Sequence, residues 1–172
     1  MTPADSPQFP AAAVSAHALS QTVPTADGTL TILSEVGLAV QAGETLAITG
    51  ASGSGKSTLL GLLAGLDHAS SGEIVLLGER LGGLDEDARA RLRAGRVGFV
   101  FQSFQLLPAL TALENILLPL ELAGRADARE RALHWLDRVG LAARAGHTPR
   151  QLSGGEQQRV ALARAFATDP EI

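Results

Sequence analysis

The spacing of hydrophobic and polar positions changes along this chain, and the change predicts where strands and helices lie. Short apolar runs bounded by polar or turn-forming residues are typical of strands. They occur at 30–33, 36–40, 45–49, 73–77 and 96–101. We therefore expect ordered structure to begin near Leu30, after a flexible lead over residues 1–27.

Beyond residue 102 the apolar spacing becomes helical. Helices are expected over 113–123 and 127–139, and another opens near Ser153. Two more are expected earlier, from Ser57 to Leu66 and over 85–94, where acidic residues precede arginines as the helix dipole favours. In the second late helix a core stripe is formed by Ala128, Ala132, Leu136 and Val139. The pattern predicts an α/β chain with strands first and helices afterwards.

Composition narrows the class of protein. The 172 residues are 45% hydrophobic and 19% charged, as expected for one globular domain with a real core. The net charge of −4 provides no basic field, so we expect no nucleic-acid partner. The absence of cysteine excludes disulfides and thiolate metal sites, and fits a cytoplasmic location. No run approaches the roughly 20 apolar residues that span a bilayer, so any membrane role is expected through a partner.

A glycine-rich loop carries the first chemical signal. It follows the expected strand at 45–49, precedes the expected helix, and matches G-x-x-x-x-G-K-[ST]. Glycines allow consecutive N–H groups to turn around an anion, Lys56 reaches β- and γ-phosphates, and the Ser57 hydroxyl can ligate Mg²⁺. A plain glycine-rich turn is the alternative, and the full match makes it the weaker one. The loop consists of Gly50, Ala51, Ser52, Gly53, Ser54, Gly55, Lys56, Ser57 and Thr58.

Lys56 is the only lysine among the 14 basic residues, and the others are arginines. An ammonium is a compact point charge on a thin stem, whereas a guanidinium is a broad planar fork. We infer that the closed loop selects the slimmer cation, which supports a nucleoside triphosphate as its ligand.

A second candidate anion site lies at 153–156. Ser153 and Glu156 form an S-x-x-E capping box ahead of an apolar helical run. Gly154 and Gly155 weaken a first helical turn by about 1 kcal/mol each, which makes sense if a ligand must approach the backbone. For the box alone an ordinary helix cap is the favoured reading.

The stretch LSGGEQQRVALARA resembles the signature motif of ATP-binding-cassette ATPases. With GASGSGKST before it and Gln102 between, the resemblance covers roughly residues 30–172. FVFQSFQLLPALTALENILLPLELAG and GLLAGLDHASSGEI resemble the lipoprotein-releasing, macrolide-export and cell-division branch more narrowly. The resemblance implies a P-loop NTPase nucleotide-binding domain over 28–172, with a small N-terminal antiparallel β part and a helical subdomain at about 103–166.

The resemblance also implies partners and roles. Two copies would pack head to tail, and Ser153, Gly154 and Gly155, beside Glu156, would contact the γ-phosphate of ATP held by the other copy. Gln102 would touch Mg²⁺ or the attacking water and report nucleotide state to an integral membrane permease. The full-length parent of this chain would then lie on the cytoplasmic face of the inner membrane and act as the energy-coupling ATPase. Two alternatives stay open: a regulatory module that signals without transport, and, less favoured by the compact spacing, a soluble non-transport cassette.

The segment after Gln102 has two interpretations. Leu106, Leu107, Pro108 and Leu110 either fill the core of the helical subdomain or line a groove for the membrane partner. Trp135 is expected to lie in a helix and to serve as a packing residue. The scattered histidines are expected to be solvated: His17, His68, His134 and His147.

The sequence departs from the family at two places. Val23 stands where the family has an aromatic residue against adenine, so we expect weak discrimination of ATP from GTP. The family's Mg²⁺-supporting Asp, catalytic Glu and switch His would follow Ile172. We therefore expect that no catalytic residue lies within the chain, that part of the core sheet is missing, and that these 172 residues alone are poorly stable and inactive.

Overall fold

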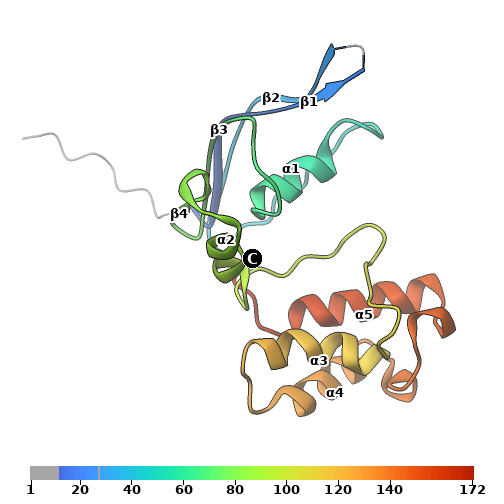
Figure 1. Ribbon diagram of the computed structural model, residues 1–172. Coiled ribbons are helices and arrows are strands. Elements are labelled where there is room, and N and C mark those ends of the chain that lie inside the picture. The colour runs from blue at the N-terminus through green and yellow to red at the C-terminus, as the bar shows by residue number, and fades with distance from the viewer. Residues whose placement is uncertain (1–11, 27) are drawn as a thin grey trace, which may run out of the picture. The chain divides into compact units, whose positions relative to one another are not determined.

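The computed structural model describes residues 12–26 and 28–172. The chain divides into two compact units, Met1–Arg91 and Leu92–Ile172. Strands dominate the first unit and helices the second (Figure 1).

The first unit contains a four-stranded antiparallel sheet. Its strands are β1 (Val14–Thr25), β2 (Gly28–Val40), β3 (Ser71–Leu76) and β4 (Glu79–Arg80), in the order β2-β1-β3-β4. Helix α1 (Lys56–Leu63) packs beside β1 and β3 and buries Leu59, Leu62 and Leu63. The expected N-terminal antiparallel β part is therefore confirmed. A 3-10 turn, η1 (Leu81–Gly83), follows β4, and α2 (Glu86–Arg93) opens with the expected acidic residues Glu86 and Asp87.

Strand β1 corrects the expected flexible lead. Residues 14–25 pair with β2 on one side and β3 on the other, so order begins before Leu30. Val14 and Ala16 alternate inward, but Ala18 has a φ of 46° and the next buried residue is Leu19, which breaks the period-2 pattern. Because of this break, the sequence pattern of residues 14–25 does not predict the strand that the structure shows. Residues 1–11 of the expected lead lie outside the described residues.

The two strands expected at 30–33 and 36–40 are one strand, β2. Glu35 between them has a φ of 48°, and its N–H donates to the Ser20 hydroxyl oxygen at 2.9 Å. The register against β1 shifts at this point, from Leu19 opposite Val36 to Gln21 opposite Leu33. The polar residues Ser34 and Glu35 at this bulge resemble a turn in the sequence pattern. In the structure, pairing with β1 keeps them within one strand.

The strands expected at 45–49 and 96–101 are not part of any sheet among the described residues. Residues 45–49 and 97–101 have no assigned strand pairing. The second segment does meet the end of the chain: Gly98 N–H donates to the Ile172 carbonyl at 2.7 Å, and Ile172 N–H donates to the Arg96 carbonyl at 3.2 Å. That pattern is the one that parallel strands make.

The second unit is a packed group of helices, as expected. Helices α3 (Ala112–Leu122), α4 (Ala128–Arg138) and α5 (Gly154–Phe166) contact one another (Figure 1), with 3-10 turns η2 (Ala142–Arg144) and η3 (Pro149–Gln151) between α4 and α5. Of the expected stripe on α4, Ala128, Ala132 and Leu136 are buried and Val139 is partly buried. The other fully buried core residues include Ile116, Leu120, Val160 and Ala163.

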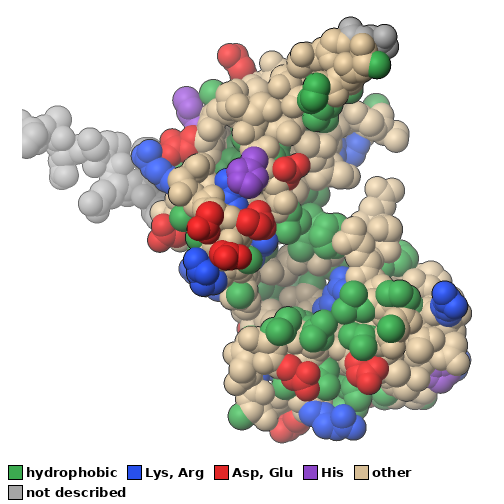
Figure 2. All heavy atoms as spheres, viewed as in Figure 1, with side chains coloured by type: hydrophobic (Ala, Val, Ile, Leu, Met, Phe, Trp, Pro, Cys, Tyr) green, Lys and Arg blue, Asp and Glu red, His purple; other side chains and the backbone are tan. Residues whose placement is uncertain are grey.

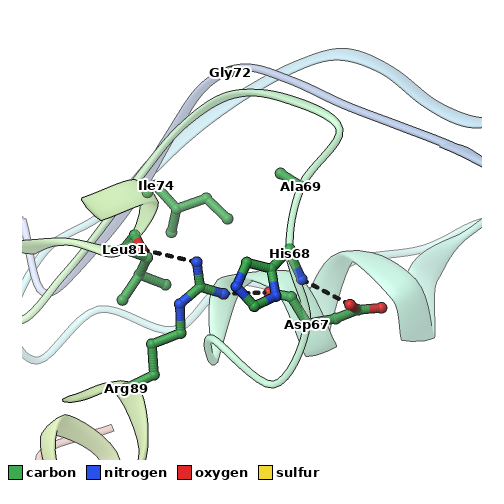
Figure 3. A pocket seen from close by; sticks show the side chains of 8 residues that line it. Asp67, His68, Ala69, Gly72, Ile74, Leu81 and Arg89 are labelled. Carbon is green, nitrogen blue, oxygen red and sulfur yellow. Dashed lines mark hydrogen bonds between the residues drawn. The ribbon is translucent and has the colours of Figure 1, made fainter. Parts of the chain in front are cut away.

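A buried arginine of α2, Arg89, binds the backbone of three neighbouring loop segments of the first unit. Arg89 donates from Nη2 to the Leu81 carbonyl at 2.8 Å, from Nη1 to the Asp67 carbonyl at 2.9 Å and from Nε to the Leu84 carbonyl at 3.2 Å. It forms one wall of a hollow of about 100 Å³, shared with His68 and Ile74 (Figure 3). Three backbone carbonyls thus fasten the loops around α1 and β4 to α2. Sequence reasoning missed this residue, because its position in a polar helix is typical of an exposed one.

Candidate functional site

The glycine loop has the backbone that the sequence pattern demands. Gly53 and Gly55 have φ values of 80° and 84°, and Gly55 is the N-cap of α1. A Cβ added at Gly55 would lie 2.9 Å from Leu33 Cδ2 and 3.0 Å from the Ile32 carbonyl oxygen. Both the left-handed angle and the close approach of β2 therefore require glycine at this position.

Lys56 turns back over the loop that precedes it. Its Nζ donates to the carbonyls of Ala51 and Gly50 at 2.6 and 2.9 Å, and to the Ser54 hydroxyl at 3.3 Å. An ammonium has three N–H groups, so all three have acceptors from the loop itself. The only lysine of the chain thus places a positive charge at the mouth of the loop.

The start of α1 faces the same loop. The first N–H groups of a helix have no acceptor within the helix, and the helix dipole makes this end positive. Ser57 is exposed in this first turn, while Lys56 and Thr58 are half-buried. Free amides, a positive dipole end, an ammonium and a hydroxyl together suit a phosphate chain with a bound Mg²⁺.

The second candidate anion site is the capped start of α5. Ser153 is the N-cap, and its N–H and hydroxyl both donate to Glu156 Oε2 at 2.8 Å, while the Glu156 N–H donates to the Ser153 hydroxyl oxygen at 3.3 Å. These bonds from Ser153, first from its backbone and then from its side chain, hold the pKa of the Glu156 carboxyl below its ordinary range. The expected capping box is confirmed.

Space remains in front of this helix end. Gly154 and Gly155 are exposed, and a Cβ added at either would meet nothing within 4 Å. The glycines are therefore not explained by crowding within the chain. They leave the first-turn backbone open to an approaching group.

Two residues that sequence reasoning missed hold the approach to this helix. Gln157 donates from Nε2 to the carbonyls of Pro149 and Leu152 at 3.0 and 3.1 Å. Arg144 Nε lies 3.4 Å from Glu156 Oε1, which ties η2 to the capping box. No local sequence signal marks either contact, because both join elements through the fold.

Gln102 lies exposed in a tight turn. The Phe104 N–H donates to the Phe101 carbonyl at 2.9 Å, and the Gln105 N–H donates to the Ser103 carbonyl at 2.7 Å. We call residues 101–105 the Gln102 turn. Its end is bound by Arg164 of α5, which sequence reasoning also missed.

The two interpretations of the segment after Gln102 each fit one part of it. Leu106 packs against the helical core, whereas Leu107 is exposed. Asn115, which is buried in α3, fixes the segment: its Oδ1 accepts from Leu107 N–H at 2.8 Å, and its Nδ2 donates to carbonyls of Leu107 and Leu110 at 3.2 and 3.1 Å. Other large apolar side chains are exposed in this unit as well, and Figure 2 shows apolar side chains spread over its visible face. They include Leu122, Leu133, Leu162 and Phe166.

The remaining candidates occupy ordinary places. Val23 is half-buried in β1, opposite Leu30 of β2. Trp135 packs on Phe166 with ring centroids 5.7 Å apart, as a packing residue should. His17, His68 and His134 are exposed and His147 is half-buried, beside Arg144 Nη1 at 3.2 Å.

The predicted site residues fall into two groups. The loop Gly50–Thr58 lies in the first unit, while Gln102 and Ser153–Glu156 lie in the second. Among residues 12–26 and 28–172, no cluster of three His, Asp or Glu side chains could hold a metal ion. Nor does any helix in this part of the chain have the length and apolarity to cross a membrane.

Comparison with known proteins gives a consistent result. The family described as ABC transporter matches residues 33–172. The chain is 55% identical over 161 residues to the uncharacterized ABC transporter ATP-binding protein YbbA of Escherichia coli K12, covering 92% of this chain and 71% of that protein.

Two further relatives have names that state a role. The lipoprotein-releasing system ATP-binding protein LolD of Hahella chejuensis is 52% identical over 141 residues, which cover 81% of this chain and 61% of that protein. The macrolide export ATP-binding/permease protein MacB of Burkholderia thailandensis is 50% identical over 151 residues, covering 87% of this chain and 23% of that protein.

Among solved structures, the ATP-binding cassette MJ0796, in a dimeric post-hydrolysis state bound to ADP and Pi, superposes with a TM-score of 0.87. It is 41% identical, and the match covers 91% of this chain and 70% of that one. The chain therefore belongs to the ABC transporter family, and its fold is that of the ATP-binding cassette.

Proposed function

We propose that this chain binds MgATP and that, within its full-length parent, it powers a membrane permease in the manner of an energy-coupling ATPase. The observation that carries the proposal is the pair of open helix starts. One is the glycine loop with Lys56 at the start of α1, and the other is the Ser153 cap with two uncrowded glycines at the start of α5. Each is suited to phosphate, and they lie in different units.

Each residue type has a task in this proposal. Lys56 neutralises charge on the β- and γ-phosphates, exchanging loop carbonyls for phosphate oxygens. The Ser57 hydroxyl would hold Mg²⁺, which would neutralise charge on the phosphates. Gln102 contacts Mg²⁺ or the attacking water.

The second helix start acts on the ATP of another copy. Ser153, Gly154 and Gly155 contact the γ-phosphate held by the loop of a second chain, so that ATP joins two copies head to tail. The dimeric cassette that is bound to ADP and Pi supports this arrangement. Closure with ATP and opening after hydrolysis would then drive the permease from the cytoplasmic face of the inner membrane. LolD and MacB, named for lipoprotein release and macrolide export, support an export or extraction role.

Hydrolysis is not assigned to a side chain of these 172 residues. Glu156 is engaged in the capping box, and Glu171 accepts from Arg96 Nε at 2.6 Å. We propose that ATP turnover by this polypeptide alone does not exceed that of its Lys56→Ala variant. Turnover clearly above that control contradicts this part of the proposal.

The binding proposal is tested with a fluorescent ATP analogue and size measurement. The parent chain is expected to bind MgATP and to form dimers with it. Lys56→Ala removes both, whereas Ser153→Arg places a bulky cation at the second site, so it removes dimers and leaves binding to the loop intact. Arg150→Gln, an exposed change on η3, serves as the control. Dimers that persist in Ser153→Arg refute the head-to-tail arrangement.

The permease contact is tested at Leu107, whose side chain is 44% exposed. Leu107→Asp is expected to abolish co-purification with the permease while sparing nucleotide binding. Leu106→Asp is the matched comparison, because Leu106 packs against the core and its change should damage folding. A Leu107→Asp variant that still captures the permease rules this contact out.

A further inference from the structure

One cation from α5 holds the end of the Gln102 turn. Arg164 Nη1 donates to the Gln105 carbonyl at 2.9 Å, and Arg164 Nη2 donates to the Phe104 carbonyl at 2.9 Å. The guanidinium is planar and rigid, so two of its donors engage two acceptors in one fixed geometry. Two consecutive peptide groups are therefore oriented by a single side chain.

Those two peptides have an unusual backbone. Phe104 and Gln105 have φ values of 60° and 43°, so two residues in succession, neither of them glycine, adopt the left-handed region. L-residues disfavour this region because Cβ approaches the carbonyl oxygen. The turn is a conformation that residues 101–105 would not select alone, and external contacts must maintain it.

Arg164 depends on the turn in return. No carboxylate pairs with Arg164 among the described residues, and its partners are the two carbonyls. Burial lowers the pKa of its guanidinium, which agrees with a partly desolvated cation. If the turn opened, a half-buried charge would lose its acceptors, which is costly. The turn and the arginine thus stabilise each other.

The same helix connects this contact to the second anion site. Helix α5 is 13 residues long, begins at the Ser153 cap and carries Arg164 in its last turn. A helix transmits a displacement along its axis because its backbone hydrogen bonds are continuous. A rigid-body shift of the Ser153–Gly155 end would therefore carry the Arg164 side chain, which holds the Gln102 turn, with it.

We propose that Arg164 is a positioning residue that fixes the Gln102 turn to α5, so that nucleotide contact at Ser153–Gly155 and the placement of Gln102 are coupled. The coupling rests on the proposed function, whereas the fixing of the turn does not. The two parts therefore have separate tests.

The first test uses the chain without nucleotide. Because the chain has no cysteine, Ser103→Cys provides a single site for a nitroxide label in the turn, and Ser103 is exposed. Adding Arg164→Gln is expected to increase label mobility, while Arg150→Gln leaves it unchanged. A label at His134→Cys on α4 should not respond, which separates opening of the turn from loss of the fold. A label at 103 that stays equally immobile in Arg164→Gln overturns the proposal.

A milder variant covers the case in which Arg164→Gln does not fold. Arg164→Lys keeps the charge but loses the planar pair of donors. The Phe104 and Gln105 amides are expected to exchange with deuterium about tenfold faster in this variant, with α3 amides unchanged. Unchanged exchange at Phe104 and Gln105 also overturns the proposal.

The second test adds MgATP. In the parent chain MgATP is expected to change the mobility of the label at 103. In Arg164→Gln the fluorescent ATP analogue should still bind to the loop, but the label should no longer respond to saturating MgATP. If the parent binds MgATP and the label does not respond, or if both chains respond alike, the coupling is refuted. If the parent binds no nucleotide, the proposed function fails, and the nucleotide-free test still decides whether Arg164 holds the turn.

Discussion

Lys56 Nζ lies 2.6 Å from the carbonyl oxygen of Ala51, five residues earlier in the same loop. With the contacts to Gly50 and Ser54, this makes the ammonium part of the loop's own structure. A phosphate must compete with these acceptors, so the lysine serves both the empty fold and the ligand.

Lys56→Arg is expected to weaken MgATP binding nearly as much as Lys56→Ala, by about tenfold or more. The charge is kept, but a planar guanidinium cannot satisfy three acceptors arranged around one point. Titration with a fluorescent ATP analogue measures the effect. Arg80→Lys, at the exposed ion pair with Glu73, is the control and should change nothing. Parent-like affinity in Lys56→Arg would show that the site tolerates any cation.

Gly55→Ala is expected to lower the free energy of unfolding by about 2 kcal/mol or more, because it adds a clash with β2 to a left-handed backbone. Gly61→Ala in the same helix is the comparison. Nothing lies within 4 Å of a Cβ there, so it should stabilise α1 by about 1 kcal/mol. Urea unfolding of both variants gives the difference, and equal stabilities would argue against the close approach of Gly55 to β2.

Asn115→Ala is expected to cost about 3 kcal/mol, because it leaves the N–H of Leu107 and the part-buried carbonyls of Leu107 and Leu110 without their partners. Chemical denaturation measures the loss. Gln158→Ala, exposed on α5, should remain within about 0.5 kcal/mol of the parent. A small cost at Asn115 would mean that water replaces its bonds.

The capping box at Ser153 predicts a dependence of stability on acid. The folded pKa of Glu156 lies below its ordinary value of 4.5, so the ionised carboxylate stabilises the fold above that pH. The contribution is lost as pH falls through the lowered folded value. Between about pH 6 and about pH 3, the parent should therefore lose more stability than Glu156→Gln. Glu130→Gln on α4 should follow the parent, and identical acid profiles for Glu156→Gln and the parent would contradict the prediction.

Val23→Tyr tests the base-contacting role suggested for this position of β1. If adenine packs there, a ring should raise ATP affinity by about tenfold, and the parent should discriminate ATP from GTP only weakly. Competition between the two nucleotides measures both effects. A more than roughly hundredfold preference of the parent for ATP would refute the second part.

The helices were the part of the fold best predicted from sequence. Helices α3, α4 and α5 follow local spacing and caps, since i to i+4 contacts depend on neighbours in the chain. Strands were predicted less well. The bulge at Glu35 and the strand hidden before Leu30 depend on hydrogen bonds to other strands, which local pattern does not encode.

The same division applies to the candidate site. The sequence by itself determined the candidate chemistry: the glycines of the loop, the single lysine and the Ser153 cap are local features of a backbone suited to an anion. Only the tertiary structure decided which side chains support them. Arg164 reaches Gln105 from 59 positions away, and Asn115 and Arg89 donate to carbonyls of neighbouring segments. Such contacts depend on where the folded backbone places an acceptor, and no spacing along the chain specifies that.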